Sequence, residues 1–476
     1  MRLAALPDIE VRGLAYDSRQ VKPGDVFIAL KGLKAAGADF AADATRRGAV
    51  AVVADRPADT AMPVPWVIVP DARVAMAALA QEFYGHPSRS MQVVGITGTN
   101  GKTTTAYLLR AVFEAAGKKC GLLGTVAYSV GDEELPAART TPEAPDVQRM
   151  FRQMVDAGCA GCVMEVSSHA LALRRVDGTA FAAGVFTNLT RDHLDYHGDM
   201  ESYFAAKRRL FDMLPADAPA VINLDDPRGE SLKKTVSRPV TYAINRAADV
   251  TPGPLRLAFD GLEFDARTPK GSVHVRSKLV GRPNVSNVLA TVATASALDL
   301  PPAAIERGLA NLSGVPGRFE LVSGSGDDIT VVIDYAHTDD ALKNLLETAR
   351  PLAQRRVITM FGCGGDRDRT KRPLMGAVAA RLSDVVVMTS DNPRSEEPAR
   401  IIEEIKRGVP ATSHRGAAIF AIVDRREAIQ FAIQKAEPGD VVLLAGKGHE
   451  QSQMIGSEEL PFDEAAIARA ALERRR

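Results

Sequence analysis

The sequence has no excess charge of either sign, few cysteines and no long hydrophobic run. Lysine plus arginine and aspartate plus glutamate both number 59, so the formal net charge is +0. This balance gives no argument for nucleic acid or an anionic membrane as a partner, and any phosphate binding must therefore be local. Residues 1–8 lack the apolar core of a signal peptide, and no later stretch is apolar for long enough to cross a bilayer. We expect a monomeric cytoplasmic protein without membrane insertion.

Cysteine chemistry is a weak candidate for the function of this chain. The four cysteines are Cys120, Cys159, Cys162 and Cys363, and only Cys159 and Cys162 form a C-x-x-C pair. A single pair without further Cys or His at zinc spacing is weak evidence for metal or redox chemistry. The sequence therefore predicts free thiols in a reducing compartment.

What is present is enough chain for several α/β domains. The 476 residues are 46% hydrophobic and 25% charged, and a prior of about 150 residues per domain suggests roughly three domains. Stretches typical of linkers at 85–90 and 314–320 predict boundaries at 1–88, 89–316 and 317–476. Alternating strand and helix patterns predict a small N-terminal α/β domain, a central domain of P-loop ATPase type with a mainly parallel sheet, and a C-terminal doubly wound, Rossmann-like domain.

Residues 93–105 combine a strand, a glycine-containing turn and a helix start. A β-branched run ends at Ile96, and after Gly101 the pattern changes to the helical spacing of apolar residues, which stops at Gly117. The turn is Thr97-Gly98-Thr99-Asn100-Gly101-Lys102-Thr103-Thr104. Its glycines let backbone amides converge, the helix start and Lys102 add positive charge, and Thr103 offers a hydroxyl to Mg²⁺. The strict G-x-x-x-x-G-K-[ST] template is not met, because Ile96 stands at its first glycine. We predict a polyphosphate-binding loop; an ordinary strand-to-helix turn with a surface lysine is the alternative.

Polar residues follow two later strand patterns of the central segment. Glu165 ends an apolar strand, where a buried carboxylate is unfavourable unless a cation or hydrogen-bond donors meet it, so it is a candidate metal ligand. Residues 187–198 follow another strand and include Asp192, His193, Asp195 and His197. Lone histidines are more often structural, but two histidines and two aspartates at one strand end favour a functional cluster.

Lys207 lies within the apolar stripe of a predicted helix over 203–214, whereas Arg208 and Arg209 point elsewhere. One interpretation is snorkelling, with a buried stem and an ammonium that reaches water. The other is a lysine whose charge is altered or paired beside metal and phosphates.

The last segment places polar residues after each of four predicted strands. These stretches are 334–337, 364–368, 391–394 and 446–450. Strand ends of a parallel sheet meet at one edge, so we expect a pocket with both signs of charge that suits a zwitterion. In the N-terminal segment, Asp17-Ser18-Arg19 can equally bind a ligand or stabilise a turn.

In this order, several of these features resemble the Mur ligase family of ATP-dependent amide-bond-forming enzymes, and the resemblance covers nearly the whole chain. The residues that carry it are the 97–103 loop, Glu165, Asp192-His193, Lys207, the 281–287 stretch, Arg318 and the 334–337 stretch. The Asp391-Asn392-Pro393-Arg394 motif is similar to that of family members that add meso-2,6-diaminopimelate to UDP-N-acetylmuramoyl-L-alanyl-D-glutamate. The resemblance implies that the three domains bind the UDP-substrate, ATP and the amino acid in turn.

The resemblance also implies roles for individual residues. ATP would contact Thr97, Gly98, Thr99, Asn100, Gly101, Lys102, Thr103, Thr104, Asn287, Arg318 and Asp334. The UDP-substrate would contact Ser18, Lys34, Thr140, Thr141, Ser167 and Arg175. Diaminopimelate would contact Arg367, Asp391, Asn392, Pro393, Arg394, Gly446 and Glu450. Mg²⁺ would be held by Thr103, Glu165, His193 and Lys207, the last as a carbamate, and catalysis would depend on Lys102, Lys207, Glu165 and His193.

Two alternatives stay open at this point. One is a related ligase with another substrate, such as a lysine-adding family member or a folylpolyglutamate synthase; a bidentate guanidinium at Arg394 suits the extra carboxylate of diaminopimelate. The other is a nucleotide-binding switch similar to P-loop GTPases, but the sequence has no Asn-Lys-x-Asp motif for guanine.

Overall fold

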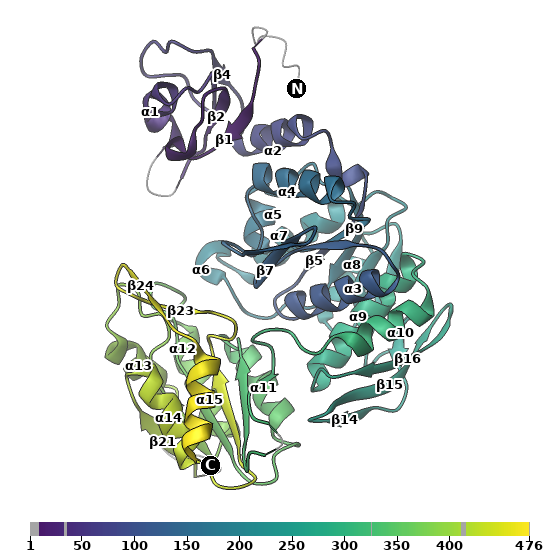
Figure 1. The fold of residues 1–476 in the computed structure, drawn as a ribbon, viewed down its shortest axis with the longest axis vertical. Helices are drawn as coiled ribbons and strands as arrows, with labels where there is room; N and C mark the ends of the chain where they lie inside the picture. Colours follow the sequence, from purple (N-terminus) through teal and green to yellow (C-terminus); the bar gives the residue numbers. More distant parts are fainter. Residues whose placement is uncertain (1–8, 33–35, 325, 411–415, 476) are drawn as a thin grey trace.

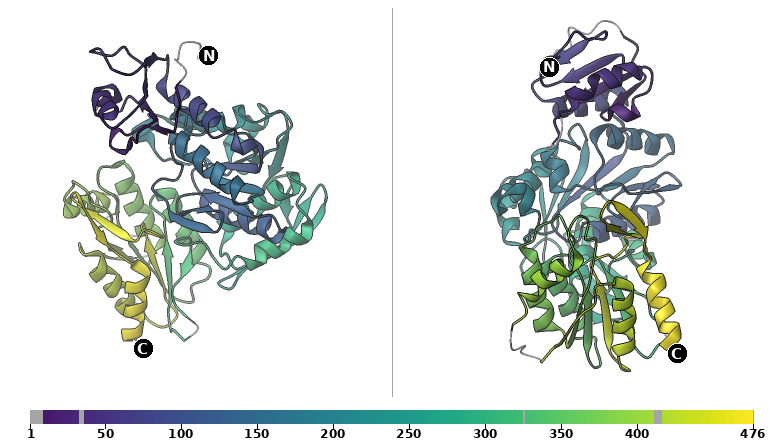
Figure 2. Two further views of the ribbon diagram at one scale, coloured as in Figure 1. Left: turned by 45° about the horizontal axis from the view of Figure 1, so that its top comes forward. Right: turned by 90° about the vertical axis from the view of Figure 1, so that its left-hand side faces the viewer.

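The computed structural model describes residues 9–32, 36–324, 326–410 and 416–475. Three α/β units follow one another along the longest axis of the molecule, with the N-terminal unit at one end and the C-terminal unit at the other (Figure 1). Figure 2 shows the same succession from the side. Within the described residues, no helix combines the length and the apolar character needed to cross a membrane.

The N-terminal unit is a four-stranded parallel sheet between two small apolar cores. Its strands are β1 (Gly13–Ala15), β2 (Asp25–Ala29), β3 (Ala51–Ala54) and β4 (Trp66–Ile68), paired in that order. Its helices are α1 (Ala41–Arg46) and α2 (Ala72–Phe83). Val26 and Ile28 of β2 face the core with α2, whereas Phe27 and Ala29 face the core with α1, because successive side chains of a strand point to opposite faces.

The central unit is built on an eight-stranded sheet in the order β12-β11-β10-β5-β9-β6-β7-β8, parallel except at β7 and β8. The strands are β5 (Gln92–Thr97), β6 (Cys120–Leu123), β7 (Ala127–Val130), β8 (Glu133–Pro136), β9 (Gly161–Glu165), β10 (Phe181–Phe186), β11 (Ala220–Asn223) and β12 (Pro239–Tyr242). The helices are α3 (Lys102–Ala115), α4 (Ala144–Asp156), α5 (Ser168–Ala172), α6 (Leu194–His197), α7 (Met200–Asp212), α8 (Pro227–Lys233), α9 (Arg282–Ala297) and α10 (Pro302–Asn311).

Strand β5 lies in the middle of this sheet and is buried on both faces, as its unbroken apolar run predicts. Val94 and Ile96 pack into the core that contains α3, α9 and α10, while Val93 packs into the core that contains α4 and α7. A second, antiparallel sheet of β13 (Thr251–Pro252), β14 (Arg256–Ala258), β15 (Gly261–Thr268) and β16 (Gly271–Ser277) covers α9 and α10.

The C-terminal unit is a doubly wound sheet in the order β17-β18-β22-β19-β20-β21. Its strands are β17 (Glu320–Leu321), β18 (Thr330–Asp334), β19 (Val357–Phe361), β20 (Val385–Met388), β21 (Ala418–Ala421) and β22 (Val441–Ala445), followed by the hairpin β23 (Ser452–Ile455) and β24 (Glu458–Pro461). Helices α11 (Asp339–Ala349), α12 (Lys371–Leu382) and α13 (Pro398–Lys406) cover one face, and α14 (Arg425–Lys435) and α15 (Glu464–Arg475) cover the other.

The fold class expected from the sequence is confirmed, and the helix expected over 203–214 is α7. Elements that the sequence did not predict include α4, α8, α10, α14, α15, β7, β8, β21 and the β23–β24 hairpin. Strand β21 is a partly exposed edge strand, and the buried face of α15 consists largely of alanines, so both carry a weak hydrophobic pattern. All four cysteines are buried free thiols, as expected.

Candidate active site

The turn between β5 and α3 can be formed only with glycine at two positions. Gly98 has φ +150° and Gly101 has φ +86°, a region that side-chain-bearing residues rarely adopt. A Cβ atom at Gly98 would lie 1.9 Å from Oγ1 of Thr187, and one at Gly101 would lie 2.3 Å from Oδ1 of Asn287. The loop is therefore packed closely between the end of β10 and the start of α9.

The end of β10 fixes the shape of this loop. Asn188 accepts a hydrogen bond from the Asn100 amide at 2.9 Å and donates one to the Asn100 carbonyl at 3.1 Å, while Thr187 Oγ1 donates to the same carbonyl at 2.7 Å. The Thr99 amide donates to the Asn188 carbonyl at 2.9 Å. Part of the polar cluster expected after β10 thus supports the loop and is not free to bind a ligand.

Two lysine side chains donate to one carbonyl oxygen of the loop. Lys102 Nζ lies 3.0 Å from the Gly98 oxygen and 2.8 Å from the Thr99 oxygen, and Lys207 Nζ lies 2.7 Å from the same Gly98 oxygen. Burial lowers the pKa of Lys102. Burial also lowers the pKa of Lys207 well below its usual value, and the neighbouring Lys102 ammonium lowers it further.

The predicted inward orientation of Lys207 is confirmed. Its side chain is 2% exposed, and Nζ lies 4.5 Å from the centre of the Tyr203 ring. The ammonium does not reach water, so snorkelling does not describe this residue. No carboxylate of the described residues forms an ion pair with it, so its protonated form would be an unpaired buried cation beside Lys102.

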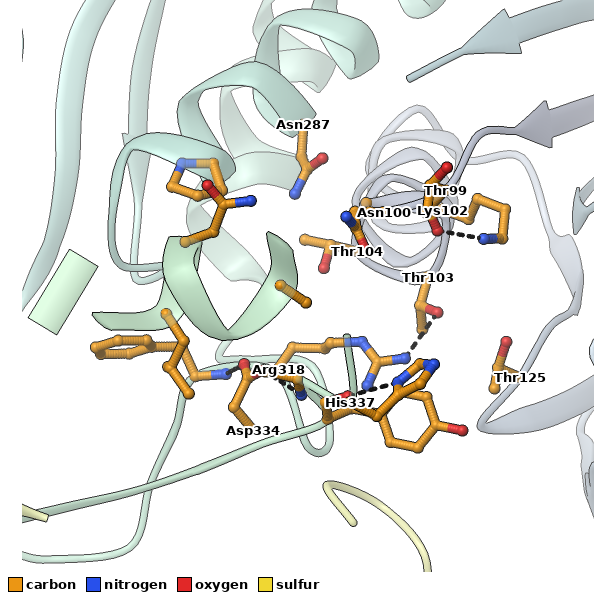
Figure 3. A pocket seen from close by; sticks show the side chains of 18 of the residues that line it. Thr99, Asn100, Lys102, Thr103, Thr104, Thr125, Asn287, Arg318, Asp334 and His337 are labelled. Atoms are coloured by element: carbon orange, nitrogen blue, oxygen red, sulfur yellow. Dashed lines mark hydrogen bonds between the residues drawn. The ribbon is translucent and has the colours of Figure 1, made fainter. Parts of the chain in front are cut away.

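A cavity of about 290 Å³ lies between this loop and the C-terminal unit. Figure 3 shows Thr103 and Lys102 on one wall, with Arg318, Asp334 and His337 on the opposite wall and Asn287 projecting from α9. The residues that line it and that the sequence had singled out include Thr99, Asn100, Gly101, Lys102, Thr103, Thr104, Thr140, Glu165, Ser167, Asp192, His193, Asn287, Arg318 and Asp334.

The C-terminal wall of the cavity presents one guanidinium to the loop. Arg318 donates to Thr103 Oγ1 at 3.2 Å and lies over the Tyr335 ring at 4.6 Å. Asp334 binds backbone amides of the same unit instead. Its carboxylate accepts hydrogen bonds from the amides of Phe319 at 2.7 Å and Ala336 at 2.8 Å. Burial raises the pKa of Asp334.

Glu165 is buried at the end of β9. The sequence predicts that a cation or hydrogen-bond donors contact such a carboxylate, and the structure shows hydrogen-bond donors. The amide of Thr125 lies 2.8 Å from Oε1, and the Thr125 hydroxyl lies 3.0 Å from Oε2. Thr103, Glu165 and His193 line the same cavity, whereas Lys207 lies behind the loop. Among the described residues, no three His, Cys, Asp or Glu side chains are arranged as a ready metal site.

His193 carries a neutral imidazole. Burial lowers its pKa to about 3, against the opposing effect of Asp192, whose carboxylate lies 3.3 Å from its Nε2. The ring packs against His169 with 4.8 Å between ring centres. A neutral imidazole is the form that binds metal ions.

Four residues assigned to the UDP-substrate by resemblance cluster around Glu165. Thr141 Oγ1 donates to the Glu165 carbonyl at 2.8 Å, and Ser167 donates its amide to Thr141 Oγ1 at 3.1 Å. Arg175 donates to the Thr141 carbonyl at 3.1 Å, and Thr140 lies 3.1 Å from Thr125 between their hydroxyl oxygens.

The other two residues of that set are not part of this cluster. Ser18 is buried in the N-terminal unit, where its neighbour Asp17 accepts from the Arg19 amide at 3.0 Å and pairs with the Arg19 side chain at 2.7 Å. This turn-stabilising role is one of the two interpretations considered for the stretch. Lys34 lies outside the described residues.

The sheet edge of the C-terminal unit brings the four polar stretches together. Asn392 donates to Glu450 at 2.8 Å, and a Cβ atom at Gly446 would lie 2.7 Å from the Asp391 carboxylate. Arg394 donates to the Gly365 carbonyl at 2.8 Å. The fourth stretch, 334–337, lies beside 446–450, where the Asp334 carbonyl accepts from the Gly446 amide at 3.0 Å and the Tyr335 and His449 rings lie 5.0 Å apart. It also lines the cavity near the loop.

Two arginines form a positively charged end of this second site. Burial lowers the pKa of Arg394, and the nearby Arg367 guanidinium lowers it further. The loops that carry them are joined: the Asp366 carboxylate accepts from the Ser395 hydroxyl at 2.7 Å, and the buried Arg372 pairs with Glu396 at 2.8 Å. Two neighbouring guanidiniums offer planar, bidentate donors to a carboxylate ligand, while Asp391, Glu450 and Asp366 act on Arg394 in the opposite sense.

The central and C-terminal units touch at the loop itself. Asn100 donates to Asp340 at 2.9 Å, and Arg191 pairs with Asp339 at 3.0 Å, both at the start of α11. A second cavity, of about 590 Å³, lies on the other side of Asn287 and is lined by both units, with Asn100, Gly101 and Thr348 shared between the two cavities.

Sequence reasoning missed several residues of the site. Thr125 follows the short strand β6 and could have been found by the same strand-end argument as Glu165. Lys447 stands inside the 446–450 stretch but was not singled out. Asp340 shows no signal in the sequence, because its contact with Asn100 spans 240 residues.

The fold and site define a three-unit α/β protein in which a phosphate-binding type of loop faces a doubly wound unit with a charged second site. Three family models match it: "Mur ligase family, catalytic domain" at residues 10–84, "Mur ligase middle domain" at 96–295, and "Mur ligase, glutamate ligase domain" at 317–448. The chain belongs to the Mur ligase family.

Individual relatives share the whole length of the chain. A protein of Geobacillus thermodenitrificans named UDP-N-acetylmuramoyl-L-alanyl-D-glutamate--2,6-diaminopimelate ligase is 49% identical over 99% of this chain and 96% of its own. A protein of the same name from Solibacter usitatus is 48% identical over 98% and 94%.

Among solved structures, a ligase of that name is 34% identical, with a TM-score of 0.68 over 98% of this chain and 95% of its own. MurF ligase of Thermotoga maritima in complex with ADP shares the fold, at 19% identity and a TM-score of 0.69 over 99% and 100% of the two chains.

Proposed function

We propose that this chain is an ATP-dependent ligase that adds meso-2,6-diaminopimelate to UDP-N-acetylmuramoyl-L-alanyl-D-glutamate and so makes the UDP-muramoyl-tripeptide of peptidoglycan synthesis. The observation that carries the proposal is the whole-length similarity to relatives with that name. The two-part site supports it, since a phosphate-binding loop and a charged site for a zwitterion are what this reaction requires. We assign residues 1–88, 89–316 and 317–476 to the UDP-substrate, ATP and the amino acid.

ATP fits the cavity between the two units. Its phosphates would lie on the amides of Gly98, Thr99, Asn100, Gly101, Lys102, Thr103 and Thr104 after Thr97, with Asn287, Arg318 and Asp334 around the rest of the nucleotide. Lys102 now donates to two loop carbonyls, and phosphate oxygens would replace these as its partners. The N-terminus of α3, together with the cations Lys102 and Arg318, would stabilise the charge that develops during phosphoryl transfer.

The residues present fit a magnesium ion. Glu165 uses two of about four lone-pair positions for Thr125, and the Thr103 hydroxyl and the His193 imidazole line the same cavity. Mg²⁺ usually keeps several water ligands and needs few protein ligands, so the lack of a preformed acidic cluster in the described residues does not conflict with it. When bound, the ion supplies electrostatic stabilisation of phosphoryl oxygens.

The environment of Lys207 supports its proposed conversion to a carbamate. Burial favours the neutral amine, and a neutral amine adds CO₂ with formation of an N–C bond and loss of one proton. The product is an anion beside Lys102, so a lysine whose protonated form would repel Lys102 becomes an attractive partner for it. The carbamate would then orient the magnesium ion.

Activation of a carboxylate is needed because amide formation in water is unfavourable. In the proposed reaction, the glutamyl side-chain carboxylate attacks the γ-phosphorus of ATP and ADP leaves; the amine then attacks the acyl phosphate and phosphate leaves. Ser18, Lys34, Thr140, Thr141, Ser167 and Arg175 would hold the UDP-substrate. Closure of the two units around the cavity would exclude the water that otherwise hydrolyses the intermediate.

The second site is assigned to diaminopimelate. Arg367 and Arg394 would bind the far carboxylate, and Asp391, Asn392, Pro393, Gly446 and Glu450 would surround the far amino group. Lysine lacks that carboxylate and would leave two neighbouring guanidiniums unpaired, which is unfavourable. No observation favours a folylpolyglutamate synthase or a nucleotide switch over this assignment.

A phosphate-release assay tests the proposed function. The purified chain is given ATP and UDP-muramoyl-dipeptide with diaminopimelate, lysine or no amino acid. We expect phosphate release only with both substrates, and at a much lower rate with lysine. Equal rates with lysine would contradict the acceptor assignment, and release without any amino acid would contradict ligase chemistry.

A further inference from the structure

Lys447 is a fully buried lysine at the centre of the amino-acid site. Its ammonium, 0% exposed, donates to Asn392 Oδ1 at 2.9 Å, to Glu450 Oε2 at 3.0 Å and to the Ser452 carbonyl at 2.7 Å. An ammonium has three N–H donors, so each of them is used. The residue stands between Gly446 and Gly448, at the end of β22.

These contacts orient Glu450. Its Oε2 atom accepts from both Lys447 and Asn392, the latter at 2.8 Å, whereas no described residue donates to Oε1. Asn392 is itself fixed, because its Oδ1 also accepts from the Met454 amide at 3.0 Å. Glu450 is therefore held through one oxygen and keeps the other for a ligand; its side chain is 30% exposed.

The neighbouring charges favour a cationic ligand at that oxygen. Arg425 and Glu464 form a buried pair at 2.8 Å that is neutral as a unit. The positive charge of Lys447 helps to keep the pKa of Asp391 low despite its burial, together with Arg425. The Arg394 guanidinium also acts electrostatically on Glu450, and the free Oε1 atom of the Glu450 carboxylate is the acceptor left for a cationic donor.

We infer that Lys447 is a positioning residue that turns Glu450 toward the amino group at the far end of the acceptor and thereby makes the chain select for that amino group. This inference rests on the proposed function. It separates two kinds of selectivity: the arginines select for the far carboxylate, and the Lys447–Glu450 pair selects for the far ammonium.

A purely structural role is the competing explanation. Lys447 also binds the Ser452 carbonyl, and so connects β22 to the β23–β24 hairpin. Loss of that connection would lower stability and weaken binding of every acceptor alike. The test must therefore compare acceptors that differ in one group.

Three acceptors separate the two explanations. Diaminopimelate has both far groups, 2-aminopimelate lacks the far amino group, and lysine lacks the far carboxylate. For Lys447→Met we expect the ratio of kcat/KM for diaminopimelate over 2-aminopimelate to fall about 10-fold or more, which is the scale of one hydrogen bond to a charged group. The preference over lysine and the KM for ATP should stay as in the wild type.

Lys447→Gln keeps a shorter neutral donor and removes the charge, so we expect a smaller fall in the same ratio. If the methionine variant does not fold, the glutamine variant decides. Arg356→Met is the matched control: it removes a cation that pairs with buried Asp440 at 2.7 Å, next to the other end of β22. We expect it to lower the unfolding temperature without changing either selectivity.

An equal loss of activity with all three acceptors, or an unchanged ratio for 2-aminopimelate in a folded Lys447 variant, would overturn the inference. Failure of the proposed function has a different signature, because the wild-type chain itself would then show no diaminopimelate-dependent phosphate release.

Discussion

Replacement of Gly101 by alanine is a direct test of the loop as the nucleotide site. The residue has φ +86°, and an added Cβ would lie 2.3 Å from Oδ1 of Asn287. Asn287 is 8% exposed and donates to Asn284 at 2.9 Å, so it cannot simply rotate into water. The new methyl group must displace the Asn287 side chain or the loop itself.

The size of the effect follows from two separate terms. A side-chain-bearing residue in the left-handed region costs about 1–2 kcal/mol of stability. Displacement of Asn287 or of a loop amide removes at least one hydrogen bond to a charged phosphate, worth about 1.5–3 kcal/mol. We therefore expect the KM for ATP to rise about 10-fold to 100-fold, with a modest fall in unfolding temperature.

Gly117, at the other end of α3, provides the matched control. It has φ +74°, and an added Cβ would meet nothing within 4 Å. Gly117→Ala should show the same loss of stability with an unchanged KM for ATP. Phosphate release at varied ATP, together with thermal unfolding of both variants, measures the two terms. An equal KM for ATP in the two variants would refute the assignment of this loop to the nucleotide.

Three further outcomes follow from the site. Lys207→Ala should be nearly inactive in the ligation assay and partly restored by a small added carboxylate such as formate; full activity without it would count against the carbamate. Arg394→Ala should raise the KM for diaminopimelate about 10-fold or more and leave the KM for ATP unchanged, and unaltered diaminopimelate kinetics would contradict its role. Burial, assisted by Arg318, lowers the pKa of His449 to about 4. Folding thus favours the neutral form of His449. Its contribution to the free energy of unfolding is fully present above the pKa of about 6.5 that the residue has in the unfolded chain, and it is lost as the pH falls from there through 4. Between pH 7 and 4, chemical denaturation should show that the free energy of unfolding falls less steeply in His449→Gln than in the wild type. An identical fall in the two proteins would exclude this contribution.

Much of the C-terminal unit could be predicted because its strands are buried on both faces. The apolar runs 330–334 and 357–361 coincide with β18 and β19, since a strand covered by helices on both sides needs no polar alternation. The inward position of Lys207 followed from helical spacing alone in the same way. Local periodicity is sufficient to predict which side chains are buried where that burial depends on the geometry of a single strand or helix.

The contacts between elements could not be predicted in this way. Strand β22 pairs between β18 and β19, and this order places 446–450 beside 334–337, where the Gly446 amide donates to the Asp334 carbonyl at 3.0 Å. The 391–394 stretch reaches 446–450 through side chains, since Asn392 donates to Glu450 at 2.8 Å. The partners of Lys102 are carbonyls of its own loop, and Lys447 holds Asn392 across 55 residues. No periodic pattern records a contact between residues so far apart in the chain.

The sequence by itself determined the strands and helices with strong apolar patterns, the polar residues that follow those strands, and the glycine-containing turn, because each depends on neighbours within a few residues. Only the tertiary structure decided which strand ends meet, that two lysines share the Gly98 carbonyl, and which oxygen of Glu450 is left for a ligand. These depend on strand order and on close packing between distant segments, which are properties of the folded chain as a whole.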